Sequence, residues 1–195
     1  NRLSTLPPQK LTIPQTMIKK IRQKLEKNEP ISFPEAMELM QLQGKDRMEL
    51  FSLANHVRSK LGDRVDLCSI VNAKCGLCPE DCKFCAQSVH NDTEITSHPM
   101  MDEEEILNMA QMMEEEGAAR FCIVTSGKGV DGEDFENMLR SIRRIRKETC
   151  LSVCISSGML TEERALALKN AGATRLHHNL ETSKNFFNNI CTTHT

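Results

Sequence analysis

The sequence lacks the features that would assign it to a membrane or to a nucleic acid. It contains no apolar run of the roughly 18 residues that a membrane helix needs, which argues against membrane insertion. Its formal net charge is only -2, from 25 basic and 27 acidic residues, so nothing indicates a nucleic-acid partner. The N-terminus is polar and basic, without the apolar segment of an export signal. We therefore expect a cytoplasmic protein.

The sequence also lacks the even number of cysteines that is typical of a secreted disulfide scaffold. It has nine cysteines, and four of them lie between positions 75 and 85. An odd and clustered set fits reduced thiols better than disulfides. The clustered cysteines are therefore candidates for binding a metal or a metal cofactor.

Three of these cysteines have a spacing that suits an iron–sulfur cluster. Cys78, Cys82 and Cys85 stand in the run Cys-Pro-Glu-Asp-Cys-Lys-Phe-Cys, a C-x3-C-x2-C pattern. A 4Fe-4S cubane has four irons that each need one outside ligand, so three thiolates leave one iron open to a small molecule. The pattern therefore predicts an enzyme.

This stretch and three later ones resemble the biotin synthase family of radical S-adenosylmethionine (SAM) enzymes. The first stretch runs from residue 71 to residue 88. The others, in the order of the family, are Arg-Phe-Cys-Ile-Val at 120–124, Val-Cys-Ile-Ser-Ser-Gly at 153–158, and His-His-Asn-Leu-Glu-Thr-Ser at 177–183 followed by Thr-Thr-His-Thr at 192–195. A short cysteine motif alone indicates only the superfamily, whereas four ordered stretches are specific.

The resemblance implies a sulfurtransferase that inserts sulfur into dethiobiotin to form biotin. In such an enzyme one electron passes through a 4Fe-4S cluster, here on Cys78, Cys82 and Cys85, into SAM. The resulting 5'-deoxyadenosyl radical abstracts hydrogen from dethiobiotin. The resemblance also implies an electron donor such as a flavodoxin or a ferredoxin, and it suggests a homodimer.

Cys122 and Cys154 each lie inside an expected strand. A buried cysteine taken alone is more often a packing residue than a ligand. The resemblance implies the opposite here, because the matching positions supply thiolates to an auxiliary 2Fe-2S or related cluster, the proposed sulfur donor. Further ligands would follow residue 195, so we expect this chain to hold the auxiliary cluster poorly and to be inactive by itself.

Polar residues after residue 175 are candidates for binding the cofactor. Alternation along an expected strand places His177, Asn179 and Glu181 on one face, with His178 and Leu180 on the other. The first face resembles the family's contact surface for the SAM ribose and for the ureido ring of dethiobiotin. Asn179 matches the family pattern, whereas His177 and Glu181 depart from the Asn and Asp of some members; a structural role is the alternative for His177.

Phe84 lies between the second and third cysteines of the motif. It resembles the aromatic position whose main chain meets the adenine of SAM, while its side chain alone indicates only packing.

The order of the expected elements predicts an α/β fold. Residues 1–61 form an N-terminal segment with three helices, and residues 62–195 form the first part of a radical SAM barrel domain. In the second part we expect strands and helices to alternate, with strands at 65–72, 120–125, 151–156 and 175–180 and helices at 102–116, 132–148 and 161–170. This alternation predicts a parallel sheet, and hence an incomplete TIM-type (β/α) barrel of about four units preceded by helices.

Other interpretations stay open. Cys75 departs from the family pattern but completes a second C-x2-C pair, so a zinc-binding module on four thiolates is an alternative, although the two pairs are unusually close. A related radical SAM enzyme, of the hydrogenase-maturase or methylornithine-synthase type, would not need the pair Cys122 and Cys154. The remaining thiols match no ligand position and are expected to be core or surface residues: Cys68, Cys150 and Cys191.

Overall fold

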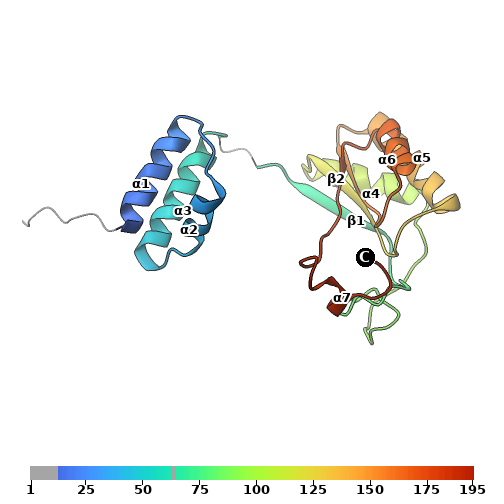
Figure 1. Cartoon of the computed structure of the whole chain (residues 1–195). Helices are drawn as coiled ribbons and strands as arrows, with labels where there is room; N and C mark the ends of the chain where they lie inside the picture. Colours follow the sequence, from blue (N-terminus) through green and yellow to red (C-terminus); the bar gives the residue numbers. More distant parts are fainter. Residues whose placement is uncertain (1–12, 63–64) are drawn as a thin grey trace, which may run out of the picture. The chain divides into compact units, whose positions relative to one another are not determined.

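The computed structural model describes residues 13–62 and 65–195 and divides the chain into two compact units, residues 1–65 and residues 66–195 (Figure 1). Residues 1–12 of the expected N-terminal segment lie outside the described residues. Over the ranges 13–62 and 65–195, no helix has both the length and the apolar composition to cross a membrane.

The first unit consists of three helices, α1 (Ile13–Glu26), α2 (Phe33–Met40) and α3 (Gly44–Ser59). A capping box begins α2, because the Ser32 hydroxyl accepts from the Glu35 N–H and the Glu35 carboxylate accepts from the Ser32 N–H at 2.8 Å. Lys24 of α1 also donates to Glu35, at 2.7 Å. The buried core of this unit is small and consists of Ile18, Ile21, Leu39, Leu42 and Leu53.

The apolar residues of α3 predict a stripe along one face of the helix, made of Met48, Leu50, Leu53, Ala54 and Val57, and this prediction is only partly correct. Leu53 is buried and Leu50 packs against the core of the unit, but Met48 and Val57 are exposed. Two short neighbouring helices cover only one narrow face of α3, so the flanks of the stripe remain uncovered within this unit.

The second unit is a parallel sheet of four strands in the order β1-β2-β3-β4 (Figure 1). The strands are β1 (Cys68–Lys74), β2 (Arg120–Thr125), β3 (Ser152–Ser156) and β4 (Arg175–Leu176). Between them lie α4 (Glu103–Glu115), α5 (Gly132–Glu148) and α6 (Glu162–Ala171), and α7 (Phe187–Ile190) follows β4. Strands adjacent in the sequence are therefore adjacent in the sheet, which confirms the expected α/β fold with consecutive βα units of an incomplete barrel.

Helices α4, α5 and α6 cover one face of this sheet. The strand residues on that face are almost fully buried: Val71, Ala73, Phe121, Ile123, Val153 and Ile155. They share one core with helix residues such as Ile106 of α4, Ile142 of α5 and Leu168 of α6. Because side chains alternate along a strand, every second strand residue points away from these helices.

The opposite face of the sheet carries thiols. Ile70 of β1 lies opposite Cys122 of β2, and Cys122 lies opposite Cys154 of β3. Ile70 is 67% exposed, whereas Cys122 and Cys154 are only 6% and 5% exposed. In a closed (β/α) barrel this face lines the interior.

Two strands differ from the expected ranges by more than one residue. β1 begins and ends a few residues later than expected, at Cys68 and Lys74. β4 has only two residues, and the chain leaves the sheet after Leu176. β4 lies at an edge of the sheet and pairs with β3 only at Arg175 and Leu176.

Gly158 brings two loops of the site into contact. It follows β3 with φ +72°, and a Cβ placed on it would lie 2.4 Å from the Lys128 carbonyl oxygen. The next residue, Met159, donates its N–H to the same oxygen at 2.7 Å. The loops after β2 and β3 therefore touch backbone to backbone, and only glycine leaves room for this approach.

We predict that Gly158→Ala destabilises the second unit more than Gly117→Ala does. Gly117 also has a positive φ, +86°, but nothing lies within 4 Å of a Cβ placed there. The control should lose about 1 kcal/mol from backbone strain, and Gly158→Ala should lose roughly 1–3 kcal/mol more from overpacking. Urea unfolding of both variants measures the difference, and equal free energies of unfolding would contradict the close approach.

Candidate cluster and cofactor site

The loop after β1 carries the three cysteines of the motif and is braced by hydrogen bonds. The Cys78 N–H donates to the Gln87 carbonyl at 3.0 Å. The side-chain amide of Asn91 donates to the carbonyls of Cys82 and Cys85, at 3.0 and 2.9 Å. The three thiols thus belong to one compact loop at the carboxyl end of a strand, which is where barrel enzymes carry out their chemistry.

A set of hydrogen bonds, which we call the latch, joins this loop to the last residues of the chain. The Asp81 carboxylate accepts the N–H groups of Thr192 and Thr193, at 2.8 and 3.1 Å, and it also accepts from the Thr192 hydroxyl. The Glu80 carboxylate accepts from the Thr193 hydroxyl at 2.7 Å and lies 2.6 Å from Nδ1 of His194. The latch therefore holds residues 191–195 against the cysteine loop.

The two acids of the latch are carboxylates at neutral pH. Hydrogen bonds from Thr192 lower the pKa of Asp81 well below its ordinary range. Burial raises the pKa of Glu80, but hydrogen bonds from Thr193 and His194 outweigh that effect and leave the pKa lowered. Both side chains therefore act as hydrogen-bond acceptors.

The thiols of the loop are partly withdrawn from water. Cys78 is buried, and Cys82 and Cys85 are half-buried. Burial raises the pKa of Cys82 to about 12, with further contributions from a hydrogen bond to Cys191 and from the neighbouring Cys85 and Cys78. A bound metal ion reverses this effect because it deprotonates a coordinating thiol. Cys82 is therefore poorly reactive as a free thiol, and the three neighbouring thiols together suit a metal cofactor.

A cavity of about 960 Å³ opens beside the three thiols. This volume falls in the range of small-molecule sites. Its lining includes Cys78, Cys82 and Cys85 from the loop, Val124 and Ser156 from the strand ends, and residues 177–184 from the segment after β4. Thr125 also lines the cavity, and its buried hydroxyl has no hydrogen-bond partner. Three thiolates beside a ligand-sized cavity with a free polar group fit a cluster together with a bound small molecule.

The segment after β4 brings its polar residues to this cavity. His177, Asn179 and Glu181 line it, and Nε2 of His177 lies 2.7 Å from Oδ1 of Asn179. His178 and Leu180 line it as well, so the expected separation onto two faces does not hold. The strand has ended before these residues, and Glu181 has a positive φ of 61°, which breaks the alternation.

Phe84 and Cys75 also belong to the cysteine loop, and their surroundings differ from each other. Phe84 is 57% exposed. Cys75 exchanges backbone hydrogen bonds with His98, at 3.1 and 3.0 Å, and lies at the base of the loop. Within residues 13–62 and 65–195, the ligand atoms that gather within 4.8 Å of one another belong to Cys82, Cys191 and His194, not to the four clustered cysteines. The geometry therefore gives no support to a zinc ion held by those four thiolates.

Cys122 and Cys154 form a second pair of thiols, separate from the first loop. They are register partners on β2 and β3, and the cavity is lined by residues nearer the strand ends. Burial raises the pKa of Cys122 to about 12, and the hydrogen bond to Cys154 adds to the shift. The structure thus brings together two buried thiols that the sequence separates.

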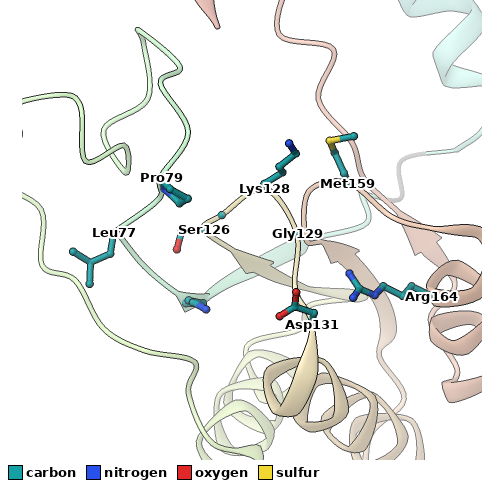
Figure 2. Close-up of a pocket in the computed structure, with 10 residues that line it drawn as sticks. Leu77, Pro79, Ser126, Lys128, Gly129, Asp131, Met159 and Arg164 are labelled. Atoms are coloured by element: carbon teal, nitrogen blue, oxygen red, sulfur yellow. The ribbon is translucent and has the colours of Figure 1, made fainter. Parts of the chain in front are cut away.

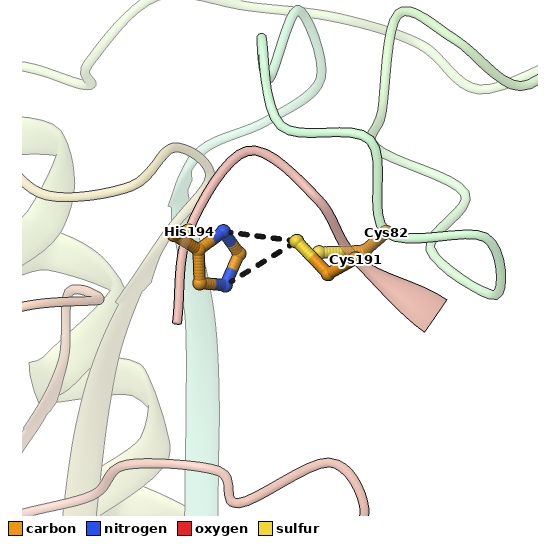
Figure 3. Close-up of side chains that lie close together, drawn as sticks. All are labelled: Cys82, Cys191 and His194. Carbon is orange, nitrogen blue, oxygen red and sulfur yellow. Dashed lines mark hydrogen bonds between the residues drawn. The ribbon is translucent and has the colours of Figure 1, made fainter. Parts of the chain in front are cut away.

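The approach of Cys191 and His194 to Cys82 was not predicted from the sequence (Figure 3). Cys191 was expected to be a core or surface thiol; it is buried, at 1% exposure, but it lies beside a residue of the cysteine motif. A signal was present, because Cys191-Thr-Thr-His194 has a C-x2-H spacing that is compatible with a shared metal ion.

A smaller hollow of about 430 Å³ lies beside the same loop (Figure 2). Its lining includes three basic side chains, Lys74, Lys128 and Arg164, and one acidic side chain, Asp131. Lys74 also forms an ion pair with Asp134 at 2.7 Å. With Lys74 paired to Asp134, the hollow presents two further basic side chains, Lys128 and Arg164, beside the acidic Asp131.

Comparison with known proteins shows which superfamily shares this fold and this cysteine loop. Residues 75–195, more than half of the chain, match the family described as the Radical SAM superfamily. The chain is 51% identical over 164 residues to a biotin synthase of Carboxydothermus hydrogenoformans, which covers 83% of this chain and 50% of that protein. A biotin synthase of Acetivibrio thermocellus is 48% identical over 173 residues, covering 88% of this chain and 54% of that protein. The chain thus spans about half the length of these curated relatives.

Solved structures show the same fold. The FeFe-hydrogenase maturase HydG from Carboxydothermus hydrogenoformans superposes with a TM-score of 0.73 at 21% identity, over 91% of this chain and 42% of that one. Methylornithine synthase (PylB) gives a TM-score of 0.66 at 21% identity, over 80% of this chain and 46% of that one. Together with the family match, the fold and the three-cysteine loop show that the chain belongs to the radical SAM superfamily.

Proposed function

We propose that the chain acts as a biotin synthase-type sulfurtransferase of the radical SAM superfamily, which converts dethiobiotin to biotin. The observation that carries this proposal is the three-cysteine loop beside a cavity of about 960 Å³, in a chain that is 51% identical to a protein named biotin synthase. The maturase and methylornithine-synthase alternatives have weaker support, since those proteins are only 21% identical.

Cys78, Cys82 and Cys85 would hold three irons of a 4Fe-4S cluster and leave the fourth open. A cluster held there would supply the one-electron reduction of SAM that precedes hydrogen abstraction from an unactivated carbon. The protein contributes position, because Asn91 and the latch fix the loop beside the cavity.

The polar side chains on the cavity wall would orient SAM and dethiobiotin. Asn179 and Glu181 would hydrogen-bond the ribose hydroxyls and the ureido ring, with His177 held beside Asn179 by their 2.7 Å contact. The free hydroxyl of Thr125 is a further partner inside the cavity. The main chain at Phe84, on the cysteine loop, would meet the adenine of SAM.

Cys122 and Cys154 would supply two thiolates to an auxiliary 2Fe-2S or related cluster. Their pairing across β2 and β3 on the face that lines a closed barrel supports this role. A sulfur-inserting enzyme needs such a cluster inside the barrel, whereas the related maturase and methylornithine-synthase types need no such pair of strand cysteines.

The electron donor is inferred from the same proposed function. The basic hollow beside the cysteine loop would favour an electron donor with an acidic surface, such as a flavodoxin or a ferredoxin. Cytoplasmic location and a homodimer stay predictions.

We predict that anaerobic reconstitution with iron and sulfide gives about four irons per chain and, after reduction, an EPR signal that changes on addition of SAM. Cys82→Ala should lose the cluster because it removes one of three ligands. Cys150→Ala is the matched control, because Cys150 is an exposed thiol outside the loop. A SAM-responsive signal that persists in Cys82→Ala would sink the assignment.

We further predict that Cys122→Ser and Cys154→Ser remove any iron bound in excess of the first cluster. Both variants should keep the SAM-responsive EPR signal, because these cysteines lie on the sheet face and not in the loop. Mössbauer spectra of the reconstituted chain separate the two kinds of iron. A second cluster that survives both substitutions would show that this pair is not its ligand set.

A further inference from the structure

Cys68 lies on the sheet face that carries Cys122 and Cys154. The three residues belong to three neighbouring strands, Cys68 to β1, Cys122 to β2 and Cys154 to β3. Cys68 pairs in register with Arg120, two residues before Cys122, and side chains two residues apart on a strand share a face. Cys68 is exposed, whereas Cys122 and Cys154 are buried. One face of the sheet therefore presents three thiols, not two.

The thiols of Cys68 and Cys122 are diagonal neighbours across two strands. Adjacent strands lie about 4.8 Å apart and two residues advance a strand by about 6.6 Å, so the two Cα atoms are roughly 8 Å apart. The side chains are close enough to interact: burial raises the pKa of Cys122 to about 12, and Cys154 and Cys68 add to the shift. Ligands of a cluster bind different irons, so they do not need the close contact that a single ion requires.

A basic residue with a free hydrogen-bond donor lies next to Cys68 on this face. Arg120 pairs in register with Cys68 on one side and with Ser152 on the other. Its Nε is buried and has no hydrogen-bond partner among the residues that the structure describes. A buried donor without an acceptor costs free energy, and thiolate ligands bring negative charge to this face. The free Nε therefore indicates that an acceptor belongs beside Cys68.

We propose that Cys68 is a third ligand of the auxiliary centre on Cys122 and Cys154, an inference that rests on the proposed function. The family resemblance assigns no ligand role to this position. As an iron binds, the Cys68 thiol releases its proton to solvent and forms an iron–sulfur bond, with no change in oxidation state. Three thiolates are as many as the cysteine loop offers the first cluster. The chain should therefore hold the auxiliary centre itself, contrary to the expectation from two ligands.

Iron binding by the Cys82→Ala variant tests the proposal without the first cluster. After anaerobic reconstitution with iron and sulfide, this variant should bind iron on the sheet face. Adding Cys68→Ser should remove most of that iron, because one of three thiolates is lost. Adding Cys150→Ser instead should leave the iron content unchanged, because Cys150 is an exposed thiol outside the site. Circular dichroism of every variant checks folding.

Alkylation of the unsubstituted chain provides a second readout. Iodoacetamide should modify both Cys68 and Cys150 in the reduced, cluster-free chain, since both are exposed. After reconstitution, mass spectrometry should show that Cys68 is no longer modified while Cys150 stays reactive. This measurement needs no substitution, so it decides the matter even if Cys68→Ser fails to fold.

The proposal and the proposed function fail in different ways. Unchanged iron content on adding Cys68→Ser in a folded protein would overturn the proposal, as would unchanged alkylation of Cys68 after reconstitution. Absence of bound iron in the Cys82→Ala variant would overturn it as well. None of these results depends on SAM. A chain with Cys68 protected but without a SAM-responsive EPR signal would count against the proposed function alone.

Discussion

The latch between Glu80, Asp81 and residues 192–194 is the interaction on which the arrangement of the site depends. It ties the loop after the first strand to the segment that follows the last one, and both segments line the cavity. Lowered pKa values keep Glu80 and Asp81 ionised at neutral pH, so the hydrogen bonds that they accept are charge-assisted. The cysteine loop thus has a fixed partner in addition to its own hydrogen bonds.

The sheet supplies the second constraint. Three helices bury one face with apolar side chains, so alternation leaves the other face to the thiols of Cys122 and Cys154. Parallel strands have all their carboxyl ends at one edge, and the cysteine loop, the loop held by Gly158 and the segment from His177 meet there. The positions of the cysteine loop, the cavity wall and the second thiol pair all follow from this one geometry.

Local sequence signals predicted the parts of the fold that depend on nearby residues. The bounds of β2 and α5 agree with expectation, because strand alternation and helical periodicity are strong there. The pairing of Cys122 with Cys154 follows from their places in neighbouring strands. The short β4 and the approach of Cys191 and His194 to Cys82 could not be predicted, because they depend on an edge strand and on the path of an irregular segment across the molecule.

We infer that Cys78, Cys82 and Cys85 would leave one iron of a cluster open to SAM. Electron–nuclear double resonance on the reduced, reconstituted chain tests it most directly, with SAM labelled with ¹⁵N at its amino group. If the amine of SAM binds the open iron, a ¹⁵N coupling should appear only with the labelled compound. A SAM-bound sample with a reduced cluster and no such coupling would contradict the claim.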